Sequence, residues 1–300
     1  MTSLLVVELR RFLGRRMVKL IALLVVAGIL VAGTILFFKS SRTRTLPAVE
    51  VNVLQGRVVE CTGGNFSMSG QRAPGETPEE FCDGFASQIG GDPRYHLTSL
   101  REAWLGVGAQ LIIVAWLLGA SFAGAEWHSG SMATLLTWEP RRVRVFLSKL
   151  VACLVLVYLG AVLAEVLLGG ALLPAALFRG TTEGVDARWL ADAAGVVGRV
   201  GIACASGAAL GYGLAMVGRN TAASLGAGFG YLLIVENLVR GFRPQWSPWL
   251  LGDNTAAFLG GAQEQVIAGR SVIEAGLVMG LYAGVVLLAG WITFSGRDVT

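Results

Sequence analysis

Long apolar runs alternate with short polar segments along this chain. A hydrocarbon layer about 30 Å thick, crossed by a helix that rises 1.5 Å per residue, needs roughly 20 apolar residues in succession. Six runs approach or exceed this length: residues 20–38, 103–125, 150–178, 200–218, 221–235 and 275–296. The pattern predicts an all-α integral membrane protein with six transmembrane helices.

Residues 1–19 form an amphipathic segment before the first run. Apolar side chains recur at helical spacing on one face and arginines on the other, as in a helix that lies in a membrane interface. The two sets are Leu5, Leu9, Phe12 and Leu13 against Arg10, Arg11 and Arg15. We expect an N-terminal interfacial helix, with a simple basic anchor as the alternative. Residues 20–38 are too long for a signal-peptide apolar region and no A-x-A-like cleavage site follows, so we expect an uncleaved span.

Residues 39–102 are the only long polar region. Their Pro, Gly and charge content predicts a small water-exposed subdomain or a mobile loop. The region contains Cys61 and Cys82, whereas Cys153 and Cys204 lie inside apolar runs. Since exposed cysteines pair only in an oxidising compartment, we predict a Cys61–Cys82 disulfide in an extracellular loop. Two free thiols are the alternative.

The distribution of Lys and Arg predicts the orientation. Basic residues are more frequent in the N-terminal segment and in residues 125–149 than in the short segments on the opposite side. The positive-inside rule therefore places both termini in the cytoplasm. The net charge of +4 is explained by this distribution and requires no nucleic-acid partner.

Residues 236–274 are apolar but interrupted. Trp246 and Trp249 lie among prolines and arginines, a composition typical of a membrane interface. We expect a re-entrant or interfacial segment on the outside, with an ordinary extracellular loop as the alternative.

Glycines four residues apart predict close helix approach, within one subunit or between two. They are Gly207 and Gly211, Gly226 and Gly230, and Gly276, Gly280 and Gly284.

Candidate chemistry is sparse. The chain is 54% hydrophobic and 15% charged, with a mean hydropathy of +0.64, which excludes an ordinary soluble domain. Its lysines are Lys19, Lys39 and Lys149, and none follows the glycine of a phosphate-binding loop. The histidines are His96 and His128, too few and too far apart for a clustered metal site. We therefore expect neither an ATPase, nor a metal site, nor a catalytic cluster.

Three charged residues fall inside or beside predicted spans. Helical rise places Glu165, Arg199 and Glu236 at one level in the outer part of the membrane. Intramembrane charges are costly unless paired or hydrated, and so they often mark a pathway. One interpretation is a structural Glu165–Arg199 ion pair. The other is a polar patch that lines an outward-opening substrate cavity.

Residues 125–149 are a polar segment between the second and third runs. It contains a turn at Ser129-Gly130, a short segment at 132–138 with an apolar face, and a stop at Pro140. Its motifs are Glu126-Trp127-His128-Ser129-Gly130-Ser131, Leu135-Leu136, Pro140-Arg141-Arg142 and Lys149-Leu150. Together they resemble the loop between spans two and three in the ABC-2 family of ATP-binding-cassette transporter permeases. Phe294 followed by Arg297-Asp298 resembles the family's C-terminal end. Ser131 departs from the usual threonine, and the first outer loop is longer than in many members.

The resemblance implies a six-span permease domain over residues 20–300, in the transmembrane subunit of an ABC exporter. Such a subunit binds no cofactor itself, because a separate ABC-type ATP-binding subunit holds ATP and Mg. It pairs as a homodimer or heterodimer among membrane lipids, is a multi-pass protein of a bacterial cytoplasmic membrane, and moves a lipid, drug-like or peptide substrate.

The resemblance also assigns a coupling helix to residues 126–138, through which the ATP-binding subunit would dock. Met132, Leu135, Leu136 and Trp138 would form its apolar face, flanked by Glu126 and the arginines. The full set of expected coupling residues is Glu126, Trp127, Ser129, Gly130, Met132, Leu135, Leu136 and Trp138. The alternative function is a membrane-embedded sensor or scaffold with the extracellular loop as its receptor. A membrane-embedded enzyme is the third class, and no catalytic cluster favours it.

Overall fold

The structure is a computed structural model that describes residues 2–40, 50–55, 58–63, 66–71, 77–79, 81–82, 94–261 and 270–296. The chain divides into two compact units. The first contains Met1–Gly28, Arg101–Gly169 and Asp186–Thr300, and the second contains Ile29–Leu100 and Gly170–Val185. The predicted tail motif at Arg297-Asp298 lies outside the described residues.

Six helices in the described part of the chain are long and apolar enough to cross a membrane, as in a multi-pass membrane protein. They are α2 (Arg16–Lys39), α4 (Leu100–His128) with the short helix η1 (Leu97–Ser99) before it, α6 (Arg142–Arg179), α7 (Ala187–Gly218), the segment Thr221–Phe242, and α12 (Val272–Gly296). Each overlaps one predicted run. Several are longer than the predicted run. α6 begins at Arg142 and Asp186 caps the start of α7, two polar positions that hydropathy alone does not identify as helix starts.

The N-terminal segment consists of one helix and the beginning of the next. α1 (Thr2–Gly14) ends before Arg15, and α2 begins at Arg16 instead of residue 20. Among the residues of α1 whose burial is described, 4–14, Glu8 and Phe12 are buried, whereas Leu13 is 54% exposed. The predicted apolar face is thus only partly correct, since it contains a buried carboxylate that the sequence analysis did not assign to it.

Close glycine contacts hold the first unit around α7. A Cβ atom on Gly211 would overlap the Trp116 carbonyl of α4, and one on Gly213 would overlap Val286 of α12. Gly207 likewise faces Ile112, so the predicted close approach at Gly207 and Gly211 is an intrachain contact. The remaining predicted glycines are different. A Cβ atom on Gly226, Gly230, Gly280 or Gly284 would meet no other part of the described chain within 4 Å, and one on Gly276 would meet Phe258.

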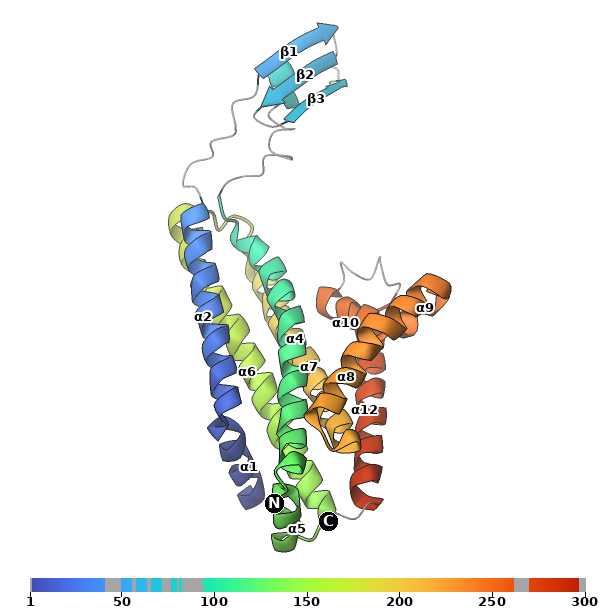
Figure 1. Ribbon diagram of the computed structural model, residues 1–300. Helices are drawn as coiled ribbons and strands as arrows, with labels where there is room; N and C mark the ends of the chain where they lie inside the picture. Colours follow the sequence, from blue (N-terminus) through green and yellow to red (C-terminus); the bar gives the residue numbers. More distant parts are fainter. Residues whose placement is uncertain are drawn as a thin grey trace. The chain divides into compact units, whose positions relative to one another are not determined.

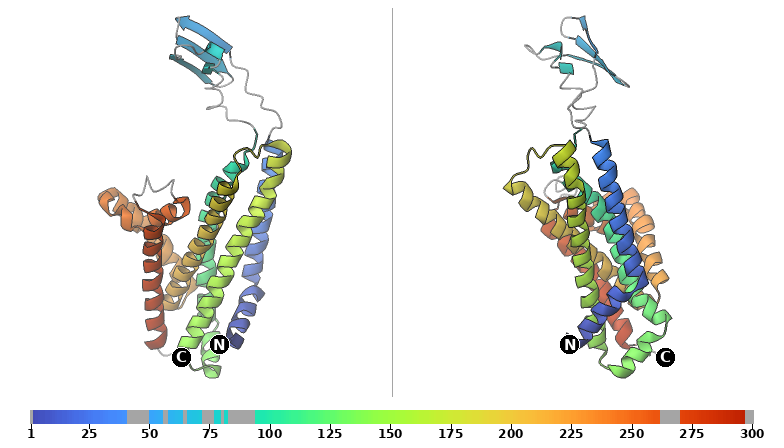
Figure 2. Two further views of the ribbon diagram at one scale, coloured as in Figure 1. Left: turned by 180° about the vertical axis from the view of Figure 1, so that it is seen from behind. Right: turned by 90° about the vertical axis from the view of Figure 1, so that its left-hand side faces the viewer.

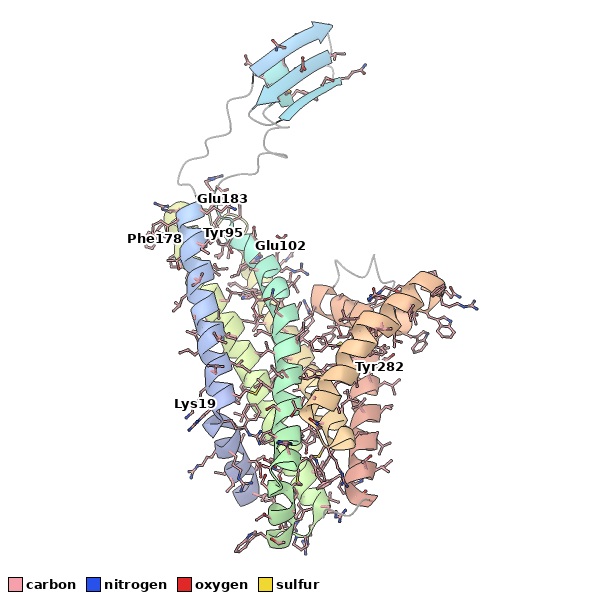
Figure 3. All side chains as sticks on the ribbon, in the orientation of Figure 1. Lys19, Tyr95, Glu102, Phe178, Glu183 and Tyr282 are labelled. Atoms are coloured by element: carbon pink, nitrogen blue, oxygen red, sulfur yellow. A yellow bond between two sulfur atoms is a disulfide. The ribbon has the colours of Figure 1, made fainter. Side chains whose placement is uncertain are left out.

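The predicted fifth span, residues 221–235, and the described part of the segment predicted as re-entrant or interfacial, residues 236–274, together form a helical hairpin. α8 (Thr221–Gly230) continues through the π-helix η2 (Tyr231–Val235) into α9 (Glu236–Phe242), and the chain returns through η3 (Pro244–Trp249) and α10 (Leu251–Gly260). α10 lies across the Val272 end of α12 (Figure 1 and Figure 2). The hydroxyl of Tyr282, which is labelled in Figure 3, lies 3.0 Å from that of Tyr231 and donates to the Trp249 carbonyl. These contacts attach the hairpin to α12; residues 262–269 lie outside the described part.

The second unit contains a sheet that the all-α prediction missed. Strands β1 (Glu50–Gln55), β2 (Val58–Gly63) and β3 (Phe66–Gln71) are antiparallel in the order β1-β2-β3. The Cys61–Cys82 disulfide is present, which confirms that prediction. Both cysteines are buried with Val59, and Val51 and Phe81 pack against them. The all-α class therefore holds for the apolar helices but not for the loop between the first two.

Elsewhere in the second unit, hydrogen bonds join the ends of three helices. Ser40 at the end of α2 donates to the Arg179 carbonyl and accepts the Tyr95 N–H. Thr181, after α6, donates its N–H to the Tyr95 carbonyl and accepts the N–H of Leu97, the first residue of η1. A Cβ atom on Gly180 would overlap the Tyr95 carbonyl, so this crossing depends on glycine. Tyr95 and Glu183 are labelled in Figure 3.

Candidate functional site

The polar segment between α4 and α6 forms a helix-turn-helix. α4 ends at His128, and α5 (Ser131–Trp138) begins after a turn in which Gly130 has φ of 69°. This left-handed conformation favours glycine. The Ser129 hydroxyl lies 2.9 Å from that of Ser131, and both donate to the Glu126 carbonyl. The turn thus directs α5 away from the axis of α4.

The exposed apolar surface of α5 is smaller than predicted. Trp138 is 86% exposed, whereas Met132 is only 1% exposed and packs inside the chain. Leu135 and Leu136 are half-buried. The predicted four-residue docking face is therefore wrong at Met132, because that side chain already fills a space within the unit. Trp138 is the main apolar group that α5 presents to solvent.

A cluster of charged side chains, most of them buried, lies between α1, α4 and α6. Lys149 Nζ lies 2.6 Å from Glu126 Oε2 and 2.9 Å from Glu8 Oε2, and the lysine side chain is 0% exposed. Arg15 Nη2 donates to Glu126 Oε1 at 2.9 Å. Arg11 pairs with Glu8 at 3.3 Å. We call these five side chains the charge cluster. They come from α1, the α1–α2 junction, α4 and α6, and so join four segments that are distant in sequence.

An aromatic ring closes one side of the charge cluster. The guanidinium of Arg15 lies 4.7 Å from the centroid of the Phe122 ring, and Lys149 Nζ lies 5.2 Å from it. Phe12 of α1 packs edge-on against the same ring at 5.1 Å. Arg15 also donates to the carbonyls of Ser121 and Phe122. Pairing, cation–π contact and hydrogen bonding together offset the cost of desolvating these charges.

A second set of contacts attaches the two ends of the α5 segment to α7 and α12. The Trp127 ring packs edge-on against Phe294 at 6.0 Å, and its N–H donates to Met216 Sδ. Arg219 lies over the same ring at 4.7 Å. Arg142, at the start of α6, donates to the Phe294 carbonyl. In Figure 1, α1, α5 and the Gly296 end of α12 accordingly lie at the same end of this unit.

The predicted coupling residues thus fall into two groups. Glu126 and Trp127 point into the unit, and Glu126 is only 8% exposed, so the expected flanking charge is an internal ion-pair partner. Ser129, Gly130 and Trp138 are exposed.

Glu8, Arg15 and Lys149 were not predicted as partners of Glu126. One signal was present: Glu8 is the only acidic residue of the basic segment 1–19, and it shares a helix face with Leu5 and Phe12.

The three charged residues predicted at one membrane level do not form one site. Glu165 is 0% exposed, and neither of its carboxylate oxygens has a hydrogen-bond partner among the described residues. The predicted Glu165–Arg199 ion pair is not formed, and Arg199 Nε is also buried without a partner in that part of the chain. Glu236 instead pairs with Arg240 at 2.9 Å and accepts the Gly252 N–H.

The first unit also contains a cavity of about 430 Å³ between α4, α7, α8, α10 and α12. None of the three charged candidates lines it, so the predicted polar patch on a cavity wall is not observed there.

Within the described residues, no three His, Cys, Asp or Glu side chains gather closely enough to hold a metal ion. In comparisons with known proteins, no protein-family model and no curated protein matches the chain.

Proposed function

We propose that this chain is the permease subunit of an ATP-driven exporter of the ABC-2 type, and that α5 is the helix through which a separate ATP-binding subunit moves it. The charge cluster is the observation that most supports this proposal. A solvent-exposed helix of 8 residues would transmit little force if its base were mobile. Here Glu126 and Lys149, just before and just after the α5 segment, meet in a 2.6 Å ion pair.

The same cluster specifies which parts of the permease would move together. Lys149 of α6 pairs with Glu8 of α1 and with Glu126 near the end of α4, and Arg15 joins the α1–α2 junction to the same glutamate. The helices on both sides of α5 are thus tied to α1. Because buried ion pairs break only at a cost of several kcal/mol, these helices would shift as one body when α5 is pushed. The substrate path would then open alternately to the two sides of the membrane. ATP and Mg would be bound by the partner subunit.

The surface around α5 indicates what kind of partner groove would receive it. Trp138 would enter an apolar pocket, because a large exposed aromatic group is the usual centre of an interface. Arg141 is exposed beside it, and Arg144 is 42% exposed and only loosely paired with Glu139 at 3.9 Å. We expect an apolar groove with an acidic rim.

The proposal includes an orientation. The end of the first unit that holds α1, α5 and the Gly296 end of α12 would face the cytoplasm, and the disulfide-bonded sheet would face the exterior. A buried disulfide supports this arrangement, since such bonds persist in oxidising compartments. A dimer with itself or with a second permease, in a bacterial cytoplasmic membrane, completes the proposed assembly.

Co-purification from the source cells tests the proposal. We expect the tagged chain to retain a Walker-type ATP-binding subunit, measured as Mg-ATP hydrolysis by the purified material. Trp138→Ala should lower the retained hydrolysis by about tenfold or more, as for the loss of an interface hot spot. Trp246→Ala is the matched control, because Trp246 is also exposed, at 58%, but lies in η3. Hydrolysis that is absent from the wild type, or equal in both variants, would contradict the proposal.

The folded sheet favours one second candidate, a sensor whose receptor is this outer subdomain. A disulfide and a buried core at Val59 give the sheet the stability of a binding module. Deletion of residues 50–82 distinguishes the two functions. An exporter should keep ATPase coupling after the deletion, whereas a sensor should lose its response to the external ligand.

A further inference from the structure

Arg199 is a cation without a bonded counter-ion in a helix long enough to cross a membrane. Its Nε atom is buried and has no hydrogen-bond partner among the described residues, and no hydrogen bond or ion pair in that part of the chain engages its two Nη atoms. The residue as a whole is only half-buried, so the Nη atoms stay open to a ligand. A partly desolvated guanidinium requires an anion or water to compensate its charge.

The guanidinium groups of Arg199 and Arg101 converge on the end of α10. Arg101 of α4 donates to the Gly260 carbonyl. A Cβ atom on Gly261 would lie 3.1 Å from Arg199 Nη2. Asp192, two turns before Arg199 in α7, is near enough to act on its charge but forms no ion pair with it. Among the residues that the structure describes, Arg199 thus has a like charge beside it and no bonded carboxylate.

An apolar cavity lies close to Arg199. Ala203, one turn further along α7, and Leu259, directly before Gly260, both line the cavity of about 430 Å³ between α4, α7, α8, α10 and α12. No Asp, Glu, Lys, Arg or His is among the described residues that line it. The wall also reaches the outer surface of the unit, where Phe229 is 45% exposed. A cation at one end of an apolar cavity matches an amphiphile with an anionic head group and a hydrocarbon chain.

The position of Arg199 along α7 indicates the depth of such a head group. α7 ends at Gly218, 19 residues further on, which is roughly 28 Å at 1.5 Å per residue. The hydrocarbon layer is about 30 Å thick, so a span with Gly218 at one boundary has Arg199 at the other, beside the polar head groups. Arginine suits a phosphate there, because its planar guanidinium donates two parallel hydrogen bonds to phosphate oxygens.

We propose that Arg199 binds the phosphate of an acidic membrane phospholipid, and that one hydrocarbon chain of this lipid occupies the cavity. The two Nη atoms donate to the phosphate oxygens. The like charge of Arg101 disfavours a head group that carries a second cation, such as choline. A free organic phosphate shares the head-group chemistry but lacks the chain, and the experiment below separates the two. The site requires neither ATP nor a partner, so this assignment is independent of the proposed exporter function.

Photolabelling of the full chain tests the site. The chain is reconstituted without nucleotide or partner in phosphatidylcholine nanodiscs. Traces of two probes with the same diazirine-labelled hydrocarbon chain are compared, one a phosphatidylglycerol and the other a phosphatidylcholine. We expect the phosphatidylglycerol to label residues 203–210 of α7 and 251–259 of α10 about tenfold more, the ratio that about 1.4 kcal/mol of charge interaction provides. Equal labelling by the two probes would overturn the proposal. Displacement of the phosphatidylglycerol by excess glycerol phosphate would also overturn it, because the site would then take a free anion.

Variants separate the cation from the cavity. Arg199→Gln should lower the labelling by phosphatidylglycerol to the phosphatidylcholine level. Arg188→Gln is the matched control, because Arg188 is exposed at the start of α7 and the substitution removes the same charge. Ala256→Trp narrows the cavity and should reduce the labelling by both probes at least fivefold, whereas Ala289→Trp, exposed on α12 outside the cavity, should not. An unchanged preference in Arg199→Gln would contradict the assignment, even if Ala256→Trp failed to fold.

Mass spectrometry of the chain purified from its source cells checks for the resident lipid. More acidic phospholipid retained by the wild type and Arg188→Gln than by Arg199→Gln supports the proposal, and equal amounts in all three contradict it. Failure of the exporter proposal is distinguishable: labelling as expected, with no co-purified ATPase, leaves the lipid site in place. Normal ATPase coupling with equal labelling by the two probes leaves the exporter and removes the lipid site.

Discussion

The charge cluster and Glu165, in the same helical unit, have opposite environments. In the charge cluster, Lys149 lies between two carboxylates at 2.6 and 2.9 Å, and Arg15 adds a further bond to one of them. The Glu165 carboxylate is equally buried but has no partner among the described residues. The cluster draws its members from several helices, so a charge in an apolar helix becomes structural only where other helices supply its partners.

The difference predicts opposite responses to neutralisation. Removal of one member of a paired buried cluster leaves the others uncompensated, which is strongly destabilising. Removal of an unpaired buried charge relieves a desolvation cost. The predictions below follow this contrast from its largest expected effect to its smallest.

Lys149→Met should have the largest effect. It leaves Glu8 and Glu126 buried without their shared cation, and we expect a loss of about 3–5 kcal/mol in the free energy of unfolding. Reversible unfolding in mixed detergent micelles, followed by circular dichroism, measures it.

The matched control is Lys19→Met, since Lys19 is exposed at the start of α2 (Figure 3). Similar stability of the two variants would show that the cluster is not structural. The triple variant Glu8→Gln, Glu126→Gln, Lys149→Met should recover much of the loss, because no buried charge of the ion pairs then remains alone.

Arg15→Gln should have an intermediate effect. The Arg15 side chain is 22% exposed, and its replacement leaves Lys149 in place to pair with Glu126. We expect a loss of about 1.5–3 kcal/mol, the range for hydrogen bonds to a charged group. The neighbouring exposed Arg16→Gln is the control, and the same unfolding measurement applies. An equal effect at both positions would assign the loss to net charge alone.

Glu165→Gln should have the smallest effect on folding. The carboxylate has no partner to lose, so stability should stay within about 1 kcal/mol of the wild type or rise. Glu126→Gln, measured alongside, should be clearly destabilised. A loss at Glu165 as large as at Glu126 would reveal an interaction that contradicts the contrast.

Local patterns predicted much of the fold. Apolar runs located the six helices, the Ser129-Gly130 turn was visible as a break before α5, and Cys61 and Cys82 indicated their own pairing. These features depend on residues close in sequence or on a single property of composition. The sheet was missed because the composition of residues 39–102 marks them as polar and exposed but does not show which short segments pair as strands.

The charge cluster was beyond the reach of such patterns. Glu8 and Lys149 are 141 positions apart, and nothing local to either indicates the other. The sequence analysis paired Glu165 with Arg199 because helical rise placed them at one depth, but depth does not fix which face of a helix a side chain occupies. Met132 was assigned to the docking surface because it belongs to the apolar face of residues 132–138, but an apolar face does not show which of its residues the chain itself covers. Tertiary packing decided each of these cases.

The central proposal is that the charge cluster makes α1, the end of α4 that leads into α5, and the base of α6 one body, which the proposed ATP-binding subunit would move. The most direct measurement is the distance between spin labels at Thr134→Cys on α5 and Leu13→Cys on α1, compared with Thr134→Cys and Ile273→Cys on α12, in the complex with the ATP-binding subunit. On adding ATP and Mg, we predict that the first distance stays constant and the second changes, and that Arg15→Gln lets the first change as well. A first distance that changes in the wild type would contradict the account.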